Sequence, residues 1–510
     1  MSTLSSVKIS TALISVYNKN GIDAIVKSLL NHNVQIISTG GTYDYLISQG
    51  FPAQKVEDIT SYPSILGGRV KTLHPLVFGG ILGRRDHETD QQEFQQYSIP
   101  SIDLVIVDLY PFEATLNSTD NEQEIIEKID IGGISLIRAA AKNFRDVVIV
   151  PSIQHYATFL EIYEKNNGYT TLDDRKLFAA HAFNVSSHYD TTIFNWFNRE
   201  AKLPVFKQSI VDVSPMRYGE NPHQEGNFFG NLTGLFEQLN GKAISYNNLN
   251  DIDAAINLAE EFDETVVAIL KHNNACGLAC RNNLSEAWKA ALAGDPLSAF
   301  GGVIITNRPV DNVTAAGISE LFFEVLIAPD FEQTALELLK QKKNRIILRR
   351  KDFQLPEKQF KSLLNGVLLQ DKDLVQDTQA SLNFVTDSKP TEAEIEDLLF
   401  ANKIVKHTKS NAIVLAKNKQ LIGSGIGQTS RVDAVKHAIE KAKSFGFDLH
   451  GAVMASDAFF PFADSVEIAQ KEGITAVIQP GGSVKDSDSV EFCNNKGISM
   501  VFTGIRHFKH

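Results

Sequence analysis

Residues 11–42 read TALISVYNKNGIDAIVKSLLNHNVQIISTGGT and contain two short apolar runs with an amphipathic segment between them. The apolar runs are residues 11–16 and 34–37, and each predicts a buried strand. Five residues between the runs recur at helical spacing: Ile22, Ile25, Val26, Leu29 and Leu30. This order of strand, helix and strand favours a parallel pair joined by a crossover helix.

The same alternation continues beyond this segment. Residues 104–107 predict another buried strand, and residues 134–144 predict a helix that leads into a strand at 147–150. Residues 198–215 mix charge and proline without periodicity, so we place a linker there. The part before the linker is therefore predicted to be a compact α/β domain.

The larger C-terminal part repeats one order of elements. A strand at 266–270 leads into KHNN (271–274), a helix follows, and the next strand is at 303–306. The elements expected later are a hairpin of strands at 412–416 and 421–424, a helix from Val432 and a strand at 452–455. Residues 341–388 are more polar and are predicted to connect two related α/β subdomains.

Composition excludes several classes of function. With 49 basic and 61 acidic residues the net charge is −12, so phosphate must be bound by local clusters, and nucleic acid is not expected as a partner. Three cysteines are too few for a disulfide framework and fit a reduced compartment. We expect a cytoplasmic protein, because no signal peptide and no run long enough to cross a bilayer is found.

Two cofactor classes are not expected. Cys276 and Cys280 lack the nearby His-x-Glu of zinc deaminases, so no zinc is predicted. GSGIGQTSR (423–431) lacks the glycine spacing of dinucleotide-binding strands, so no nicotinamide is predicted. The same run joins glycine amides, hydroxyls and Arg431 before a helix, which makes it a candidate anion site.

Candidate residues of the N-terminal domain follow its predicted strands. Residues 39–42 (TGGT) open a helix and could cradle a phosphate, although a plain tight turn is the more frequent use of such glycines. GGRVKTLHP (67–75) is either a functional loop or a solvated basic one. In the functional interpretation Lys71 faces a developing oxyanion and Arg69 makes a bidentate contact with phosphate.

Two more positions there could carry chemistry. Tyr110 in DLYPF (108–112) closes a strand where ligands bind in α/β sheets, but a tyrosine at the edge of the core is the commoner case. Asp130 precedes two glycines and the helix that bears Lys142, and a helix-capping role is the plainer alternative for it.

The strongest motif of the C-terminal part is KHNNACG (271–277), because consecutive polar residues directly follow a buried strand. His272 would act as the base, and Lys271 would keep it neutral and supply charge to an oxyanion. A hydrogen-bonded histidine at a strand end explains the lysine and the asparagines poorly. Arg217 and Tyr218 suit phosphate and base contacts, or form an ordinary surface loop.

These motifs together resemble a known family. The further ones are IDIGG (129–133), AAAKN (139–143), RYGENPHQ (217–224), SAFGG (298–302), SDAFFPF (456–462) and GIRHF (504–508). In this order they resemble the PurH family of bifunctional purine biosynthesis enzymes, which combine phosphoribosylaminoimidazolecarboxamide formyltransferase with IMP cyclohydrolase. The resemblance implies a methylglyoxal synthase-like cyclohydrolase domain over 1–198. It also implies a transformylase over 199–510, built from two zinc-free cytidine deaminase-like subdomains at about 216–370 and 390–510.

The resemblance also implies substrates and site residues. Formyl would pass from 10-formyltetrahydrofolate to aminoimidazole carboxamide ribonucleotide (AICAR), and the product (FAICAR) would close to inosine monophosphate (IMP). The cyclohydrolase would use Lys71, Tyr110, Asp130 and Lys142, with Ser15, Lys19, Thr39, Gly40, Gly41, Thr42, Arg69 and Thr72 holding the nucleotide. The transformylase would use Lys271 and His272, with Arg217, Tyr218, Gly301, Glu324, Asn411, Arg431, Phe462, Asp464, Arg506 and Phe508 around its substrates.

Glu324, whose implied role is a contact to the ribose, stands where some family members carry aspartate. The family further implies a homodimer with transformylase sites shared between subunits, and no membrane partner. The residues alone leave two competing classes: a zinc nucleoside deaminase, which the missing ligand spacing disfavours, and a protein whose N-terminal part is a nucleotide-sensing regulatory module.

Overall fold

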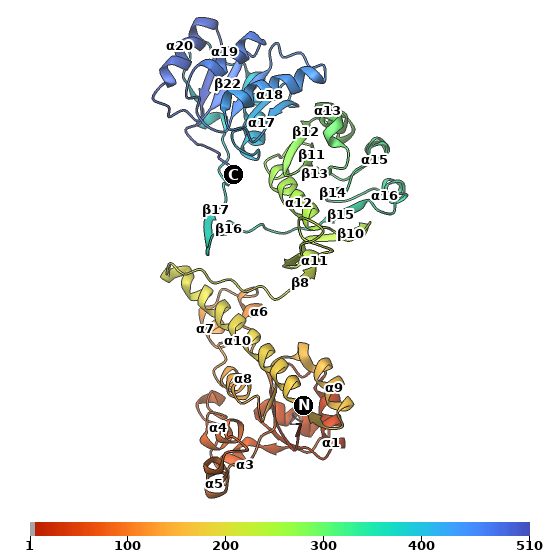
Figure 1. Ribbon diagram of the computed structural model, residues 1–510, viewed down its shortest axis with the longest axis vertical. Helices are drawn as coiled ribbons and strands as arrows, with labels where there is room; N and C mark the ends of the chain where they lie inside the picture. Colours follow the sequence, from red (N-terminus) through yellow and green to blue (C-terminus); the bar gives the residue numbers. More distant parts are fainter. Residues whose placement is uncertain (1–5) are drawn as a thin grey trace. The chain divides into compact units, whose positions relative to one another are not determined.

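The computed structural model describes residues 6–510. They divide into unit 1, which ends at Val211, and unit 2 (Asp212–His510). Figure 1 draws unit 1 in red to yellow and unit 2 in green to blue. Within residues 6–510 no helix combines the length and the apolar content needed to span a membrane.

Unit 1 contains a five-stranded parallel sheet in the order β4-β3-β2-β5-β6. The strands are β2 (Thr11–Val16), β3 (Gln35–Ser38), β4 (Gln54–Lys55), β5 (Leu104–Asp108) and β6 (Val148–Val150), and a separate pair is β1 (Val7–Lys8) with β7 (Tyr169–Thr170). The helices are α1 (Ile22–Asn31), α2 (Gly40–Ser48), α3 (Val56–Thr60), α4 (Pro75–Leu82), α5 (Glu88–Gln96), α6 (Phe112–Leu116), α7 (Glu122–Ile126), α8 (Gly132–Lys142), α9 (Tyr156–Lys165) and α10 (Leu172–Ala201).

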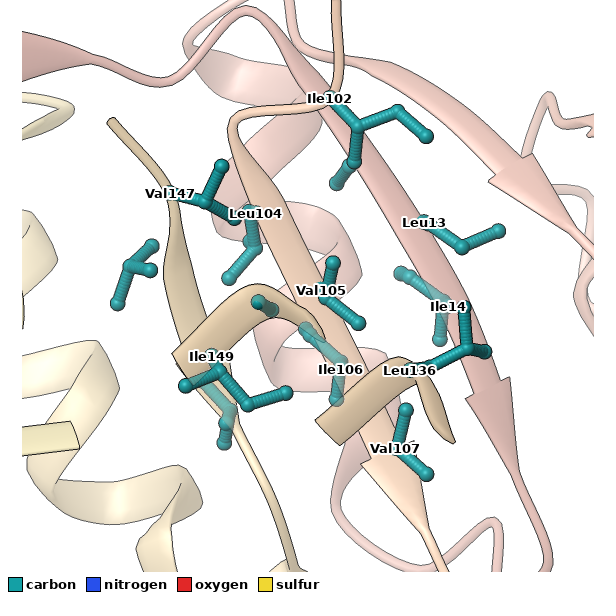
Figure 2. Close-up of a cluster of buried hydrophobic side chains, with 14 of the residues drawn as sticks. Leu13, Ile14, Ile102, Leu104, Val105, Ile106, Val107, Leu136, Val147 and Ile149 are labelled. Carbon is teal, nitrogen blue, oxygen red and sulfur yellow. The ribbon is translucent and has the colours of Figure 1, made fainter. Parts of the chain in front are cut away.

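Part of the core of unit 1 is formed by β2, β5 and β6 together with α8. Figure 2 shows Leu13 and Ile14 of β2, Val105 of β5, Ile149 of β6 and Leu136 of α8 in one cluster of side chains, and all five are buried. The strands coincide with short apolar runs in the sequence. Such runs predict strands that are buried on both faces of a sheet. The parallel order places the carboxyl ends of β2, β3 and β5 at one edge of the sheet, where ligands bind in folds of this kind.

Unit 2 contains two six-stranded sheets. The first runs β10-β15-β14-β13-β11-β12 and the second β18-β23-β22-β21-β19-β20. The first-half elements are β10 (Phe236–Asn240), α12 (Tyr246–Ala259), β11 (Val266–Lys271), β12 (Asn274–Cys280), α13 (Leu284–Gly294), α14 (Pro296–Ala299), β13 (Val303–Thr306), α15 (Asn312–Glu320), β14 (Val325–Ala328), α16 (Gln333–Lys340) and β15 (Ile346–Arg350). The second-half elements are β18 (Asn383–Phe384), α17 (Glu392–Lys406), β19 (Ile413–Ala416), β20 (Leu421–Gly425), α18 (Arg431–Ser444), β21 (Val453–Ser456), α19 (Asp464–Lys471), β22 (Ala476–Gln479), α20 (Asp486–Lys496) and β23 (Ser499–Phe502). The remaining elements of the unit are β8 (Val213–Pro215), β9 (Asn227–Phe229), α11 (Leu232–Leu235) and the hairpin β16 (Lys358–Leu363) with β17 (Gly366–Asp371).

The two halves of unit 2 have the same topology, which confirms the repeated element order predicted from sequence. In each half a hairpin (β11–β12, β19–β20) is followed by an antiparallel and then two parallel pairings, and an antiparallel strand closes the far edge. One hydrophobic cluster includes residues of both sheets together with α12 and α17. The rings of Phe262 and Phe400 lie 5.7 Å apart in it.

Three sequence expectations differ from the structure. The chain does not pass from KHNN into a helix but forms β12 first, because its residues pair with β11. Residues 341–388 are more than a connection, since β15 lies inside the first sheet between β10 and β14. Helix α10 continues through Ala201, beyond the expected start of the linker at Asn198.

Arg175 is a buried cation that ties α10 to the rest of unit 1. Its guanidinium is fully buried and donates to the carbonyl oxygens of Phe144 (2.9 Å), Arg145 (2.7 Å) and Thr170 (2.7 Å). A lysine cannot match this planar fork, so we expect Arg175→Lys to lower the free energy of unfolding of unit 1 by roughly 1–3 kcal/mol.

The measurement is a urea titration of the full-length chain. The two tryptophans lie in different units, Trp196 in α10 and Trp288 in α13, so a Trp288→Phe background leaves Trp196 to report unit 1. The exposed Arg145→Lys serves as control and should stay within about 0.5 kcal/mol of the parent. Equal midpoints for the two lysine variants would contradict a structural role of the Arg175 fork.

Candidate active sites

The glycine turn of unit 1 lies beside Lys71. Helix α2 begins directly after β3, and Gly40 has φ 38°, a conformation that glycine adopts at little cost. A Cβ atom at Gly40 would lie 3.4 Å from Lys71 Nζ, so the ammonium is next to the backbone of this turn. The hydroxyls of Ser15 and Thr39 are 2.9 Å apart at the same edge of the sheet. Backbone amides, hydroxyls and a cation thus meet at one helix N-terminus.

Thr42 has a different role from its neighbours. Its hydroxyl accepts from the backbone N–H of Val16 (3.1 Å) and donates to the carbonyl oxygen of the same residue (3.0 Å). The Thr42 hydroxyl therefore links α2 to β2, and this link fixes the position of the glycine turn.

Asp130 and Tyr110 form the second part of this site. One carboxylate oxygen of Asp130 accepts the N–H of Gly133 at 2.7 Å, the capping contact that was its plainer alternative. Burial raises the pKa of Asp130, while the Gly133 and Tyr110 backbone amides and the Lys71 charge partly offset that rise. Burial and the Asp130 charge raise the pKa of Tyr110, which favours its neutral, proton-donating form. Lys71, Tyr110 and Asp130 therefore share one electrostatic environment.

Two residues that the sequence motifs did not single out join this group. The rings of Tyr17 and Tyr110 meet edge to face at 5.6 Å, and Lys128 lies over both, 5.7 and 6.0 Å from their centroids. Burial lowers the pKa of Lys19, and the nearby Lys71 charge lowers it further against the pull of Asp108. Several cations gather here without an equal number of carboxylates, which suits an anionic ligand.

A cavity of about 240 Å³ opens beside Lys71, and its lining residues are Thr60, Tyr62, Val70, Lys71, Leu73 and His74. Thr72 also faces the site, because its hydroxyl oxygen would lie 3.3 Å from a Cβ atom at Gly132. Two expected residues are less closely associated. Arg69 is exposed and paired with Glu127. Lys142 lies in the last turn of α8, roughly 15 Å along the helix from Gly132 at its start.

In unit 2, Lys271 and His272 stand at the end of β11. The ammonium of Lys271 donates to the carbonyl oxygen of Phe300 at 2.7 Å, next to Gly301 in a left-handed conformation of φ 74°. His272 is exposed and begins the connection to β12. The ammonium keeps further N–H donors for a ligand, because a lysine has three.

Asn274 joins this pair to the second half of unit 2. Its side-chain nitrogen donates to the carbonyl oxygen of His272 (2.7 Å), and its side-chain oxygen accepts the N–H of Lys409 (3.0 Å). Asn411 lies two residues beyond Lys409. The buried amide of Asn274 therefore fixes the distance between His272 and the segment that carries Asn411.

Asn411 is held by a buried ion pair. Arg431 donates to the side-chain oxygen of Asn411 (2.7 Å) and is paired with Asp457, whose carboxylate also accepts the N–H of Ala412 (3.1 Å). Arg431 and Asp457 are both buried. The asparagine amide is oriented by this pair, with its nitrogen on the carbonyl oxygen of Gln428 (2.9 Å). Asp457 belongs to SDAFFPF but had not been assigned a role.

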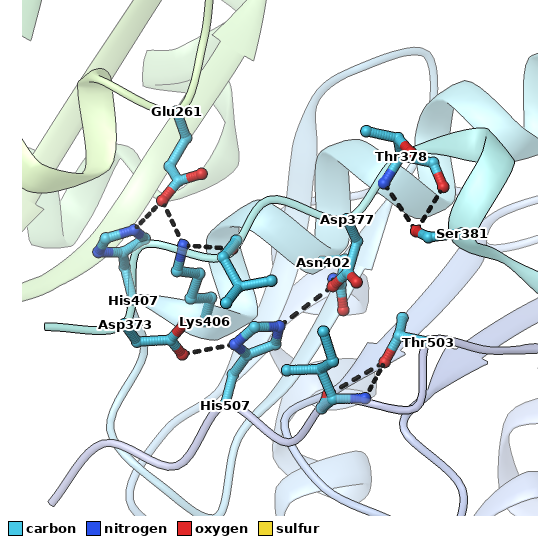
Figure 3. Close-up of polar contacts among 12 residues, drawn as sticks. Glu261, Asp373, Asp377, Thr378, Ser381, Asn402, Lys406, His407, Thr503 and His507 are labelled. Atoms are coloured by element: carbon cyan, nitrogen blue, oxygen red, sulfur yellow. Dashed lines mark hydrogen bonds and ion pairs between the residues drawn. The ribbon is translucent and has the colours of Figure 1, made fainter. Parts of the chain in front are cut away.

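The C-terminal tail also contacts the Arg431–Asp457 pair, through the backbone of Asp457. The backbone N–H of His507 donates to the carbonyl oxygen of Asp457 (3.0 Å), and Arg506 stacks on Phe508 with its guanidinium carbon 4.4 Å from the ring centroid. Figure 3 shows the imidazole of His507 between Asp373 and Asp377, at 2.6 and 3.1 Å. The buried His507 therefore fixes the position of the tail, and with it the positions of its chain neighbours Arg506 and Phe508.

This histidine makes the stability of unit 2 depend on pH. Burial alone would lower the pKa of His507, but the hydrogen bonds to Asp373 and Asp377 raise it to about 9, against an ordinary value near 6.5. Because the folded pKa is the higher one, the stabilisation is complete below about pH 6.5 and is lost as pH rises through about 9. We expect unit 2 to lose roughly 1–3 kcal/mol over that interval.

The check is a set of urea titrations at pH 6.5, 7.5 and 9 in a Trp196→Phe background, where Trp288 reports unit 2. His507→Gln should flatten the dependence, because it removes the imidazole that bonds to Asp373 and Asp377. A parallel decline in parent and variant would assign the effect to other groups.

The remaining expected residues of unit 2 have contacts outside the Lys271 group. Glu324 pairs with Lys242 at 2.7 Å, and Lys485 lies over Phe462 at 4.6 Å. Asp464 accepts the N–H of Ser465 at the start of α19. Arg217 stacks over Tyr218 at 5.7 Å, and among residues 6–510 no hydrogen bond or ring contact joins either of them to the Lys271 group. No cluster of three or more His, Cys, Asp or Glu residues that could hold a metal ion occurs within the described chain.

Comparison with known proteins agrees with this arrangement. The profile of the AICARFT/IMPCHase bienzyme family matches residues 140–441. The chain belongs to this family. The profile of the MGS-like domain matches residues 21–135, so unit 1 contains an MGS-like domain ahead of the AICARFT/IMPCHase region. Membership of the AICARFT/IMPCHase bienzyme family makes this chain an enzyme with AICAR formyltransferase and IMP cyclohydrolase activities, and the former requires a folate-type formyl donor.

Relatives match over the whole length. The bifunctional purine biosynthesis protein PurH of Bacteroides thetaiotaomicron is 62% identical over 505 residues, with 99% of both chains covered. The PurH protein of Aquifex aeolicus is 48% identical, with 98% of this chain and 100% of that one covered. A solved structure titled "Crystal structure of ForH" is 33% identical, covers 37% of this chain and 99% of its own, and has a TM-score of 0.33.

Proposed function

We propose that unit 2 transfers the formyl group of 10-formyltetrahydrofolate to the 5-amino group of AICAR, and that unit 1 closes the resulting FAICAR to IMP with loss of water. The observation that carries the first assignment is the link through Asn274, which sets Lys271 and His272 against Asn411 and Arg431. These two steps place the enzyme in purine biosynthesis, as the names of its relatives indicate.

Formyl transfer needs a base because the exocyclic amine of AICAR is a poor nucleophile. Its lone pair is delocalised into the imidazole and toward the carboxamide. His272 takes the proton as the amine attacks the formyl carbon, either directly or through the neighbouring carboxamide. Lys271 stabilises the oxyanion or protonates the departing folate nitrogen, and Asn411, oriented by Arg431, aligns the carboxamide.

Ring closure needs less acid–base chemistry. The carboxamide nitrogen attacks the formyl group of the same molecule, so a fixed orientation supplies most of the acceleration. Lys71 and Tyr110, together with the glycine amides near Asp130, stabilise the tetrahedral oxyanion before water leaves. Removal of FAICAR by this step draws the formyl transfer forward, a reason for keeping both sites on one chain.

The residue assignments follow the domain division at 198 and 199. Phosphate and ribose of FAICAR are assigned to Ser15, Lys19, Thr39, Gly40, Gly41, Thr42, Arg69 and Thr72, with Lys142 as a further catalytic group of the cyclohydrolase. AICAR and folate are assigned to Arg217, Tyr218, Gly301, Glu324, Asn411, Arg431, Phe462, Asp464, Arg506 and Phe508. The cation-rich edge of the unit 1 sheet supports the first set, and the tail contacts support the last two members of the second.

The working form is proposed to be a cytoplasmic homodimer. Hairpin β16–β17 is exposed along its whole length, with Leu364 98% exposed and Leu368 and Leu369 each 51%. Isolated hairpins are marginally stable, and apolar side chains gathered in this way favour a covered surface. A second copy of the chain is the proposed cover, and sedimentation equilibrium should give twice 56.3 kDa.

The direct test supplies AICAR and 10-formyltetrahydrofolate to the purified full-length chain and follows FAICAR and IMP. Appearance of both compounds supports the two assignments together. Conversion of supplied FAICAR without its formation from AICAR would leave only the unit 1 assignment standing.

A further inference from the structure

His272 lies in an unusual turn. Strands β11 and β12 pair up to Lys271 and Asn274, so only His272 and Asn273 connect them. Both have positive φ, 52° and 66°, as in a type I′ turn. That turn strongly prefers glycine at its second position, and non-glycine residues in the left-handed region cost of the order of 1 kcal/mol or more each. The surrounding structure must therefore hold the turn in place.

Asp251 of α12 supplies that hold. Its carboxylate accepts the backbone N–H of Asn273 at 2.6 Å, and the backbone N–H of His272 is near enough to help lower the pKa of this carboxyl, which burial raises. The side-chain amide of Asn273, with its nitrogen toward α12, adds a contact of 3.1 Å to the same carboxylate. Helix α12 belongs to the core of unit 2, so its Asp251 fixes the turn to that core.

The second half of unit 2 contains the same device. The connection between β19 and β20 includes Asn418 and Lys419, again with positive φ of 56° and 50°. Asp397 of α17 accepts their two backbone N–H groups at 2.7 and 2.6 Å. Both aspartates lie three residues after the residue that closes the capping box of their helix, Asn248 in α12 and Glu394 in α17.

The two turns differ in the roles of their side chains. Lys419 is paired with Glu264 and Glu396 at 2.9 and 2.8 Å, and no residue assigned to either reaction stands in this second turn. The aspartate is therefore a structural feature of the repeated fold, and only the first copy holds a catalytic side chain. A functional effect of Asp251 must arise through the position of His272.

We propose that Asp251 is a positioning residue for formyl transfer, which holds the turn at His272 and Asn273 so that the imidazole meets the AICAR amine. The inference rests on the proposed role of His272. A displacement of about 1 Å at a reacting group can cost up to about 100-fold in rate. We expect Asp251→Ala to lower kcat for formyl transfer by about 10- to 100-fold, with a smaller change in KM for AICAR.

Asp397→Ala is the matched control, because it removes the corresponding aspartate from the turn that carries no catalytic residue. It should leave formyl transfer within about twofold of the parent even where it lowers stability as much as Asp251→Ala does. Cyclisation of supplied FAICAR is the internal control in every variant, since Asp251 and Asp397 both belong to unit 2.

A rescue variant separates positioning from general damage. Asn273→Gly places glycine where a type I′ turn prefers it, so the turn should form without the carboxylate. We expect Asp251→Ala with Asn273→Gly to recover most of the kcat lost in Asp251→Ala. Asp251→Asn, which keeps one acceptor oxygen and the side-chain shape, should lose less than Asp251→Ala and covers the case in which the alanine variant does not fold.

The outcomes distinguish this inference from the proposed function. Full formyl transfer in both Asp251 variants, or an equal loss in Asp397→Ala, overturns the positioning role. So does a failure of glycine at 273 to restore any activity to a folded Asp251→Ala protein. His272→Ala assayed in the same series tests the function itself, because normal transfer in that variant removes the role on which the inference rests.

Discussion

Replacing His272 with alanine should lower formyl transfer by about 10²- to 10⁴-fold, the range in which a general base contributes to an enzymatic rate. His272 is exposed directly after β11 and follows Lys271 in the chain, and its backbone carbonyl is bonded to Asn274, which also contacts the segment that carries Asn411. Loss of the imidazole leaves the substrate contacts in place but removes the group that takes the proton. The fall should therefore be in kcat, with KM for AICAR changed only a little.

The measurement uses the full-length enzyme with AICAR and 10-formyltetrahydrofolate, and cyclisation of supplied FAICAR is followed separately. His437→Ala, at an exposed position of α18, is the matched control and should leave both rates unchanged. Near-normal transfer by His272→Ala would remove the base from the mechanism. An equal fall in both activities would indicate damage to the fold instead.

Much of the strand pattern could be predicted because apolar runs of four to six residues indicate buried strands directly. The runs at 11–16 and 303–306 coincide with β2 and β13. Strand β12 was missed because NACGLAC has no clear alternation and contains glycine. That strand forms because its partner β11 is adjacent, and a Cβ atom at Gly277 would lie 2.1 Å from the carbonyl oxygen of Ala291, so glycine is needed there.

The motifs located the candidate sites but not the contacts between them. Polar residues after buried strands identified Lys271 and His272, and glycines before a helix identified residues 39–42. The bond between Asn274 and Lys409 joins positions 135 residues apart, which no local pattern reports. No sequence pattern indicated a role for Asp251, because an aspartate inside a helix ordinarily lies on the solvent-exposed face.

The repeated topology suits the proposed position of the formyl transfer site. Hairpins β11–β12 and β19–β20 begin equivalent sheets, and a helical aspartate holds the turn of each. The first hairpin presents Lys271 and His272, whereas the second half contributes Asn411 and Arg431 from either side of its own hairpin. In the proposed site, the two copies of one fold thus supply different parts, the acid–base pair from one and the orienting amide from the other.

The second large effect is expected at Lys71, where methionine keeps the length of the side chain but removes its charge. The ammonium lies beside Gly40 and near Asp130, at the edge of the sheet where the oxyanion of ring closure is proposed to form. Loss of one oxyanion donor typically costs about 10²- to 10³-fold in kcat. We expect that fall in the cyclisation of supplied FAICAR, while formyl transfer by unit 2 stays unchanged.

A second readout follows from the neighbouring carboxyl. Burial already raises the pKa of Asp130, and the positive charge of Lys71 holds that rise back. Removal of the charge should raise this pKa further, so the acid limb of the residual cyclisation rate should move to higher pH in Lys71→Met. The exposed Lys165→Met is the control for loss of a lysine from unit 1 and should change neither the rate nor the pH profile. If Lys71→Met cyclised FAICAR at the parental rate, the oxyanion would have to be stabilised by Tyr110 and the glycine amides alone.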